Sequence, residues 1–326
     1  MIPKRLRVAY LGNLYHQKTQ SVRFFVELLQ EHFDVDFYWG LPRNQCREID
    51  TKKVVDGRYD VVVCLQVMLQ PEVLSEMAPH GNVLMVPMYD ESRASSPDRW
   101  ARYKPFRFLS FCQRLHRDLG AVGLRSRYVQ YYPEPAPQAT PTAGAASRAG
   151  ARVFFWQRRD ELNWEHVRVL LKGNAIEQVH LHRALDPGAT YVAPNPQEKS
   201  AYRIVETDWF EHRDDYLAAV DACDVFIAPR PWEGIGLAFL EAMARGKCVV
   251  AVDGPTMNEY IVHGTSGLLV DLNRLQPLDL SRRLELGDCA LRSVSRGRAA
   301  WLRQIKHVID EVRTAARQDR PSWSVS

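Results

Sequence analysis

The sequence lacks the patterns that mark several other classes of protein. Its six cysteines include no Cys-x2-Cys pair, so neither a zinc site nor a disulfide framework is expected, and reduced thiols in the cytoplasm are expected instead. No run reaches the ~20 apolar residues of a membrane-spanning helix, and the basic start is not followed by the long apolar segment of a signal peptide. The formal net charge of +4 is mild, so nucleic acid is not an expected partner.

Common nucleotide-site and hydrolase motifs are missing as well. No Gly-x-Gly-x-x-Gly follows the first apolar strand, which argues against a nicotinamide site, and no Gly-x4-Gly-Lys-[Ser/Thr] phosphate loop is present. The surroundings of Ser266 do not form the nucleophile elbow of a hydrolase. No Asp-x-Asp stands at a strand end where a transferase would hold a cation. We therefore expect neither a metal site nor another cofactor.

What the sequence does contain is an alternation of short apolar strands and helical segments over 326 residues, a length that suggests two domains. Such alternation predicts an α/β fold with parallel sheets covered by helices on both faces. The expected strands cover residues 7–11, 35–39, 60–65, 82–88, 108–111, 128–132, 152–156, 177–182, 203–206 and 224–228. Ligands of such sheets bind at the carboxyl ends of strands, which points to Gly12, Asn13 and Asp90.

A segment rich in Pro, Ala, Thr, Gly and Ser divides the chain at residues 134–150 and predicts a flexible linker. The predicted organisation is therefore a first domain over residues 1–133, a second over 151–297, and a last helix with a tail over 298–326.

The most informative stretch covers residues 226–246. An apolar strand is stopped by two prolines, and two glycines then open a helix that ends near Gly246. Free N–H groups at such a helix start suit a phosphate; here they belong to Gly234, Ile235, Gly236 and Leu237. Glu233 lies in the turn and Glu241 eight positions later on the helix, and both carboxylates suit hydroxyl donors such as a ribose and a sugar. A plain strand–loop–helix connection is the alternative for an isolated Glu-x7-Glu.

The sequence after this turn makes the pattern more specific. Glu233-Gly-Ile-Gly-Leu-Ala-Phe-Leu-Glu-Ala-Met-Ala-Arg-Gly246 is followed by a strand, by Asn258-Glu-Tyr-Ile261 and by Gly264-Thr-Ser-Gly-Leu-Leu-Val270. Over residues 221–271 the chain resembles family 4 of the glycosyltransferases. The resemblance implies the GT-B architecture, in which two Rossmann-like domains face a cleft and the last helix crosses back onto the first domain.

The same resemblance implies a hexosyl- or related glycosyltransferase of polysaccharide biosynthesis. It would move a sugar from a nucleoside diphosphate sugar to a hydroxyl of a glycan or glycolipid, with retention of configuration and without a metal. The first domain would bind the acceptor and the second the donor, with Glu241 on the ribose and Glu233 on the donor sugar.

In similar enzymes an Arg and a Lys hold the diphosphate after the first strand of the second domain. Arg158 and Arg159 stand at that strand end, but Asn163 occupies the region of the Lys. We expect one of the two arginines to bind the diphosphate, and a surface ion pair with Asp160 or Glu161 is the alternative.

In the first domain, similar enzymes often carry a His near the reacting carbon. The residue at the matching strand end is Asp90, which could accept the proton of the acceptor hydroxyl, bind a sugar hydroxyl, or only cap the next helix. His16 is a candidate contact for the acceptor, and the turn at Gly12 and Asn13 is a candidate phosphate loop. His116 is expected to be structural.

Basic and aromatic residues alternate after Asp90, namely at Arg93, Arg99, Trp100, Arg102, Tyr103, Lys104, Phe106, Arg107, Phe108, Arg114 and Arg117. The pattern fits an ordinary solvated face, or a surface that docks on an anionic membrane presenting a lipid-linked acceptor. The expected location is the cytoplasm or the inner face of the plasma membrane. Two other functions remain open, a nucleotide-sugar 2-epimerase on the same fold and a non-catalytic nucleotide-sugar-binding subunit.

Overall fold

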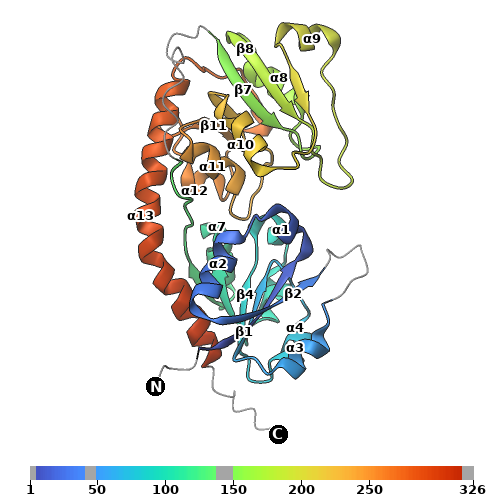
Figure 1. Cartoon of the computed structure of the whole chain (residues 1–326), viewed down its shortest axis with the longest axis vertical. Helices are drawn as coiled ribbons and strands as arrows, with labels where there is room; N and C mark the ends of the chain where they lie inside the picture. The colour runs from blue at the N-terminus through green and yellow to red at the C-terminus, as the bar shows by residue number, and fades with distance from the viewer. Residues whose placement is uncertain (1–4, 41–48, 137–149, 318–326) are drawn as a thin grey trace. The chain divides into compact units, whose positions relative to one another are not determined.

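The computed structural model describes residues 5–40, 49–136 and 150–317. Most of the predicted linker, residues 137–149, lies outside these ranges. The chain divides into two units, one made of residues up to 130 together with those from 301 onward, and one made of residues 131–300. Each unit is an α/β layer structure with its own sheet (Figure 1).

The first unit contains a six-stranded sheet in the order β2-β1-β3-β4-β5-β6, and all five neighbouring pairs are parallel. Its strands are β1 (Arg7–Asn13), β2 (Asp34–Gly40), β3 (Val61–Leu65), β4 (Val83–Val86), β5 (Arg107–Ser110) and β6 (Arg125–Tyr128). Its helices are α1 (Leu14–Thr19), α2 (Arg23–His32), α3 (Thr51–Gly57), α4 (Pro71–Met77), α5 (Tyr89–Ser92), α6 (Pro97–Ala101) and α7 (Gln113–Ala121).

The second unit contains another six-stranded parallel sheet, in the order β12-β11-β10-β7-β8-β9. Its strands are β7 (Ala151–Trp156), β8 (Ile176–His182), β9 (Val205–Thr207), β10 (Val225–Ile227), β11 (Cys248–Val252) and β12 (Leu268–Val270). Its helices are α8 (Trp164–Leu171), α9 (Pro196–Ala201), α10 (Arg213–Asp221), α11 (Leu237–Ala244) and α12 (Met257–Tyr260), and a 3₁₀ turn covers Leu272–Arg274.

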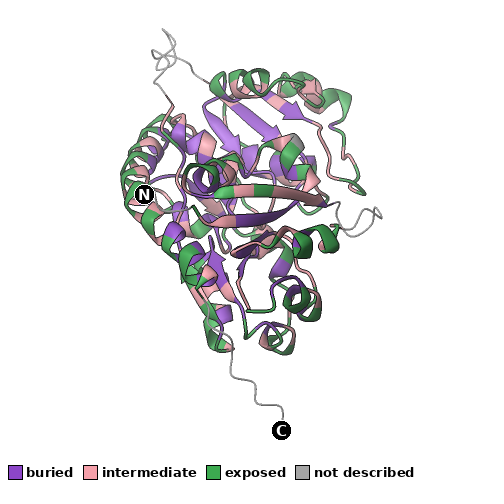
Figure 2. Cartoon of the chain, turned by 60° about the horizontal axis from the view of Figure 1, so that its bottom comes forward, coloured by how far each residue is buried: buried purple, intermediate pink, exposed green. Residues whose placement is uncertain are grey.

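The central strands form the core of each unit. β3 and β10 are buried along their whole length, because helices cover both faces of a parallel sheet. Figure 2 shows strands in the interior largely as buried, while the outward faces of the helices are largely exposed. The predicted α/β fold with parallel sheets is therefore confirmed.

The last helix, α13 (Arg283–Ala316), is one continuous helix, whereas the sequence predicted that the last helix begins at residue 298. Two glycines inside it, Gly287 and Gly297, allow close packing: a Cβ atom there would lie 2.1 Å from the carbonyl oxygen of Gly246 and 2.4 Å from the ring of Tyr132. Beyond residue 300 the helix packs on elements of the first unit, where Trp301 contacts the ring of Phe24. This confirms that the last helix returns to the first domain.

The prediction of a strand at residues 128–132 is wrong in its bounds. β6 covers Arg125–Tyr128 and pairs only with β5. As an edge strand it alternates exposed and half-buried residues, including Arg125 and Arg127, and therefore lacks the apolar run by which the inner strands were recognised.

Candidate functional site

The candidate site is built around the loop between β10 and α11. Gly236 immediately precedes α11 and has a φ of +79°. A Cβ atom at this position would lie 1.9 Å from the ring of Phe239, so only glycine fits both the left-handed backbone and the available space. The loop therefore enters α11 in one fixed direction, and the N–H groups at Leu237 and just before it lie at the positive end of the helix.

Glu233 lies in this loop with its side chain largely buried. The side chain is 11% exposed, and its Oε2 lies 3.8 Å from Nη1 of Arg230. The carbonyl oxygen of Glu233 accepts a hydrogen bond of 2.6 Å from the hydroxyl of Thr256. The loop is thus held at Glu233 through both the main chain and the side chain, and the carboxylate is an acceptor suited to hydroxyl groups.

Glu241 projects from the second turn of α11. Its carboxylate forms an ion pair with Arg213, the first residue of α10. Burial raises the pKa of Glu241 above its ordinary value, and the guanidiniums of Arg213 and Arg245 offset part of this increase. The nearby hydroxyl of Tyr216 is buried, and burial together with the charge of Glu241 raises its pKa.

Three arginines gather around one carboxylate at the end of β7. Arg158 donates to Oδ1 of Asp186 at 2.7 and 3.1 Å, and Arg159 donates to Oδ2 at 3.1 Å. Burial alone would raise the pKa of Asp186, but Arg158, Arg159 and Arg230 hold it below its ordinary value. Three guanidiniums therefore lie close to the carboxylates of Asp186 and Glu233.

The alternative considered for these arginines, a surface ion pair with Asp160 or Glu161, named the wrong carboxylates. Asp160 instead accepts a hydrogen bond of 2.7 Å from the N–H of Thr190. Their actual partner, Asp186, lies in the segment after β8, 27 and 28 residues along the chain. The sequence around Asp186 contains no motif that would have identified it. Asn163, in the region of the missing Lys, is the N-cap of α8.

In the first unit, Gly12 and Asn13 do not form the expected turn. They are the last residues of β1 and pair with Trp39 and Gly40 of β2. A Cβ atom on Gly12 would lie 2.5 Å from the ring of Tyr10 and 2.8 Å from that of Trp39, so aromatic packing alone already requires a glycine. The side chain of Asn13 caps α1, because its Oδ1 accepts a hydrogen bond of 2.9 Å from the backbone N–H of Tyr15.

His16 lies in α1 and is 8% exposed. Burial lowers its pKa to about 4, although a hydrogen bond with Gln66, the residue after β3, acts in the opposite direction. Its Nδ1 has no hydrogen-bonding partner among the residues that the structure describes. The imidazole is therefore neutral at pH 7, and it stands at the carboxyl ends of two neighbouring strands, β1 and β3.

Asp90 is the second residue of α5, after the end of β4. The N-cap position of this helix belongs to Met88, and its side chain makes no cap hydrogen bond, so the interpretation of Asp90 as a cap is wrong. His116 is structural, as predicted: its Nδ1 lies 3.0 Å from the hydroxyl of Ser126, and its ring stacks on Tyr128.

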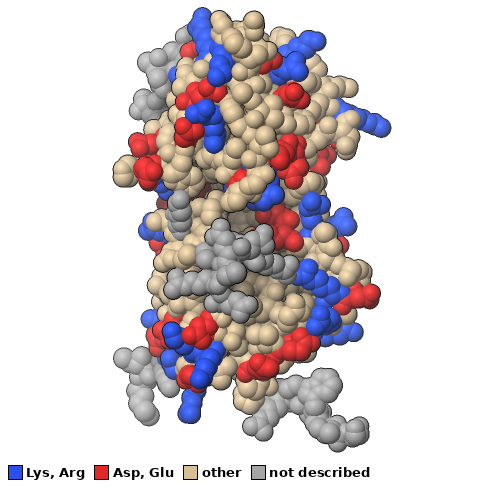
Figure 3. Space-filling model, turned by 90° about the vertical axis from the view of Figure 1, so that its right-hand side faces the viewer, with Lys and Arg blue, Asp and Glu red and all other residues tan. Residues whose placement is uncertain are grey.

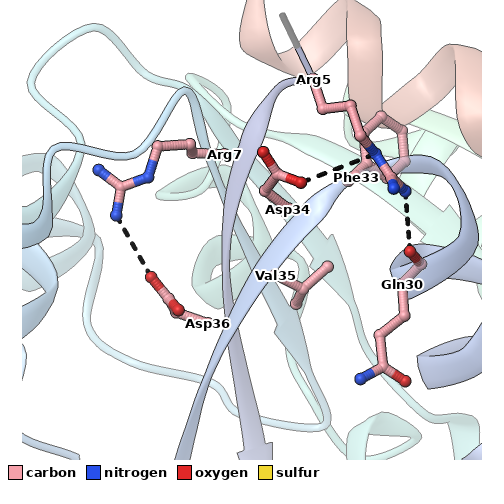
Figure 4. Close-up of a pocket in the computed structure, with 7 residues that line it drawn as sticks. All are labelled: Arg5, Arg7, Gln30, Phe33, Asp34, Val35 and Asp36. Atoms are coloured by element: carbon pink, nitrogen blue, oxygen red, sulfur yellow. Dashed lines mark hydrogen bonds and ion pairs between the residues drawn. The ribbon is translucent and has the colours of Figure 1, made fainter.

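An open pocket of about 450 Å³ lies elsewhere in the first unit, at the amino ends of β1 and β2 (Figure 4). Its charges compensate each other, with Arg7 3.3 Å from Asp36 and Arg5 3.7 Å from Asp34. This pocket lies at the amino ends of the strands, whereas His16 and Asp90 follow the carboxyl ends of β1 and β4. Ligands of parallel sheets bind at the carboxyl ends. We therefore assign it no part in the site.

The stretch that carries Glu233 and Glu241 is also the stretch that a known family shares. Residues 202–286 match the family model of glycosyl transferases group 1. Among curated relatives, the lipopolysaccharide core biosynthesis mannosyltransferase LpsB of Rhizobium meliloti is 42% identical over 59 residues, which is 18% of this chain and 17% of the relative. The D-inositol 3-phosphate glycosyltransferase of Corynebacterium kroppenstedtii is 28% identical over 158 residues, 46% of this chain and 31% of the relative. The matched part is therefore less than a third of either relative.

Solved structures resemble the chain over nearly its whole length. Sucrose-phosphate synthase from Thermosynechococcus elongatus matches with a TM-score of 0.68 at 16% identity, covering 95% of this chain and all of that one. Anabaena HepE in complex with UDP matches with a TM-score of 0.63 at 15% identity, covering 94% and 100%. At these identities the likeness concerns the fold alone. It is the GT-B fold of two Rossmann-like domains that the sequence predicted.

Proposed function

We propose that this protein is a glycosyltransferase that moves a sugar from a nucleoside diphosphate sugar to a hydroxyl of a glycan or glycolipid. One observation carries the proposal: Glu233 and Glu241 lie at the start of α11, within the segment that matches the family model, and Arg230 beside Glu233 belongs to the arginines that surround Asp186. Hydroxyl acceptors beside an anion site are what a sugar linked to a diphosphate requires. The mannosyltransferase and inositol phosphate glycosyltransferase names of the two relatives point to the same class of reaction.

On the donor side, Glu241 would accept hydrogen bonds from the ribose and Glu233 from the donor sugar. The diphosphate would bind the N–H groups of residues 234–237 and the guanidiniums of Arg158 and Arg159, which can form paired hydrogen bonds with phosphate oxygens. When the bond to the sugar breaks, negative charge grows on the departing diphosphate, and these fixed donors stabilise it. We further propose, from the sequence resemblance, that the sugar keeps its anomeric configuration.

We propose that no metal ion is needed, because guanidiniums already supply the positive charge at the diphosphate. Activity measured in EDTA should equal the activity measured with Mg²⁺ or Mn²⁺. A loss of turnover in EDTA that added metal restores would contradict this part of the proposal.

On the acceptor side, we propose that Asp90 accepts the proton of the attacking hydroxyl, and that His16 contacts the acceptor. A carboxylate is a suitable proton acceptor, and the neutral His16 ring lies at the carboxyl ends of β1 and β3. Asp90→Asn should lower turnover by about 10²-fold or more while leaving nucleotide affinity unchanged. Unchanged turnover in this variant would mean that another group accepts the proton.

The proposal is tested first by binding. The melting temperature of the protein should rise with UDP or GDP, because a ligand that binds only the folded state stabilises it. The matching donors, UDP-glucose and GDP-mannose, should then be hydrolysed slowly without an acceptor. Glu233→Gln should abolish this hydrolysis, whereas Glu285→Gln, which changes an exposed glutamate on α13, should not. A protein that binds no nucleoside diphosphate would refute the proposal.

The same assays separate the two alternative functions. An epimerase would convert UDP-N-acetylglucosamine alone to its 2-epimer, which a transferase would not do. A non-catalytic subunit would bind nucleotide sugars and show neither hydrolysis nor transfer.

We also propose that the protein works in the cytoplasm at an anionic membrane that presents the acceptor, as polysaccharide biosynthesis requires. Among the described residues no helix is both long enough and apolar enough to cross a membrane. The four aromatic residues of the basic segment, Trp100, Tyr103, Phe106 and Phe108, are buried in the core, so such docking would rest on charge.

Figure 3 shows basic and acidic residues interspersed on one face of the molecule. Within the basic segment, Arg102 pairs with Glu72 and Arg114 with Asp118. Binding to anionic lipid vesicles should therefore be weak and should vanish at high salt. Binding that persists in 1 M salt would contradict charge-based docking, and the absence of binding at low salt would contradict the membrane proposal itself.

A further inference from the structure

Thr256 has a backbone conformation that threonine rarely adopts. It lies between β11 and α12 with a φ of +77° and a ψ of −59°, and its side chain is completely buried. A β-branched residue at positive φ is a genuine outlier, because its side chain crowds the backbone. These angles correspond to the strained form of the γ-turn. Strain of this kind persists only where the surroundings enforce it, and it gathers at functional sites.

This conformation brings the Thr256 hydroxyl to the loop between β10 and α11 that carries Glu233. The hydroxyl donates a hydrogen bond of 2.6 Å to the carbonyl oxygen of Glu233, 23 residues earlier in the chain. The backbone N–H of Thr256 donates a long hydrogen bond to Oε1 of Glu259, with 3.4 Å between the nitrogen and the oxygen. A Cβ atom on Gly254 would lie 3.5 Å from the carbonyl oxygen of Pro231, so the two loops also pack together two residues before this hydrogen bond.

The position needs a residue that tolerates a positive φ, donates a hydrogen bond and fills a buried volume. Other residues would meet only part of these needs. Glycine would adopt the positive φ without strain but has no hydroxyl. Valine would fill the same buried volume, equally strained, and would leave the carbonyl of Glu233 without this donor. Serine would keep the hydroxyl and lose a methyl group. Threonine keeps both the hydroxyl and the packing and accepts the backbone strain.

We propose that Thr256 is a positioning residue that fixes the direction of Glu233. Its hydroxyl holds the main chain at Glu233, and Arg230 meets the carboxylate on the other side, so the carboxylate is oriented before a donor binds. The proposal rests on the proposed function in one respect, namely that Glu233 contacts the donor sugar. In this proposal Thr256 acts through Glu233 and not by contacting a substrate.

The test compares Thr256→Val, Thr256→Gly and Thr256→Ser. In the first measurement, which needs no activity, amide hydrogen exchange is followed in peptides that cover residues 229–241. Exchange should rise in the Val and Gly variants and stay at the wild-type rate in the Ser variant. Wild-type exchange in the Val variant would overturn the proposal, whatever the reaction proves to be.

The second measurement compares kcat, KM and melting temperature with UDP-glucose or GDP-mannose as the donor. Thr256→Val should lower kcat about 10- to 100-fold, as a slight misplacement of a catalytic group does, and should leave the affinity for UDP or GDP within about twofold. Thr256→Ser should restore most of kcat. Thr256→Gly relaxes the backbone but loses the buried side chain and its hydrogen bond, and it should show the low kcat of the Val variant whatever its melting temperature.

A kcat that follows the melting temperature across the three variants would assign Thr256 a merely structural role. If the wild-type protein neither binds nor hydrolyses these donors, the proposed function fails, and hydrogen exchange alone decides whether Thr256 positions the loop.

Discussion

Replacing Glu311 with glutamine should destabilise the first unit by about 2–4 kcal/mol. The Glu311 side chain on α13 is 5% exposed. Its oxygens accept hydrogen bonds from Arg107 at 2.9 and 3.3 Å and from Arg127 at 2.6 Å. Glutamine keeps the size of the side chain but leaves Arg107, itself only 19% exposed, opposite a neutral amide. Removing one partner of a buried ion pair costs about 3–5 kcal/mol. We expect the somewhat smaller cost of about 2–4 kcal/mol, because Arg127 is 44% exposed and its charge is screened by water.

The pH dependence of this effect has a definite sign. Burial alone would raise the pKa of Glu311, but Arg107 and Arg127 hold it below its ordinary value. The stability that the carboxylate contributes is therefore present above the pKa of the unfolded state, about 4.3, and is lost as the pH falls through the lower folded value. The difference between wild type and Glu311→Gln should be full at pH 7 and should shrink below about pH 4.3.

Urea unfolding at pH 7 measures this difference, and the neighbouring Asp310→Asn is the matched control. Asp310 lies 3.9 Å from Arg313 in a pair whose members are 61% and 50% exposed, and such surface pairs contribute at most about 1 kcal/mol. If Glu311→Gln were as stable as Asp310→Asn, the reasoning about the packing of α13 on the first unit would be refuted.

Three further predictions concern other parts of the chain. Gly287→Ala should destabilise the protein by about 1–3 kcal/mol, because its Cβ would lie 2.1 Å from the carbonyl oxygen of Gly246. Gly120→Ala is the control and should be neutral or stabilising, because a Cβ there meets nothing within 4 Å. Equal urea midpoints of the two variants would contradict this prediction. Because burial lowers the pKa of His16 to about 4, stability should fall as the pH drops below about 6.5, by about 3 kcal/mol at pH 4. His16→Gln should flatten that dependence in urea titrations, and an unchanged slope would refute it. Arg230 lies near Asp186 together with Arg158 and Arg159, so we expect it to contribute to the diphosphate site as well. Arg230→Gln should weaken UDP or GDP binding about tenfold and hardly affect the binding of the free nucleoside in calorimetry, and equal losses for both would contradict this expectation.

The sequence was most informative where local chemistry decides the structure. Continuous apolar runs predicted β3 and β10, since strands buried on both faces contain few polar residues. Glycine spacing predicted the turn into α11, and Gly236 has the left-handed backbone that such a turn needs. The placement of Glu233 in the loop and Glu241 on the helix followed from the same spacing.

Long-range contacts could not be derived in this way. Asp186 binds Arg158 and Arg159 because β7 and β8 are neighbours in the sheet, and no local pattern reveals which carboxylate will follow the neighbouring strand. The continuity of α13 through Gly287 depends on the backbone of Gly246 lying against it, which helix propensity does not report. The strained backbone of Thr256 has no sequence signal at all, because the residues around it, not its own preference, enforce it.

The central claim, that the second unit binds a nucleoside diphosphate sugar with Glu241 on the ribose, is tested most directly by calorimetric titration of UDP and GDP. The wild-type protein should bind at least one of them, and Glu241→Ala should weaken that binding about tenfold or more, since a hydrogen bond to a charged group contributes about 1.5–3 kcal/mol. Glu285→Ala, at an exposed site on α13, should bind as the wild type does. Equal affinities of the wild type and Glu241→Ala, or no binding of either nucleotide, would contradict the account.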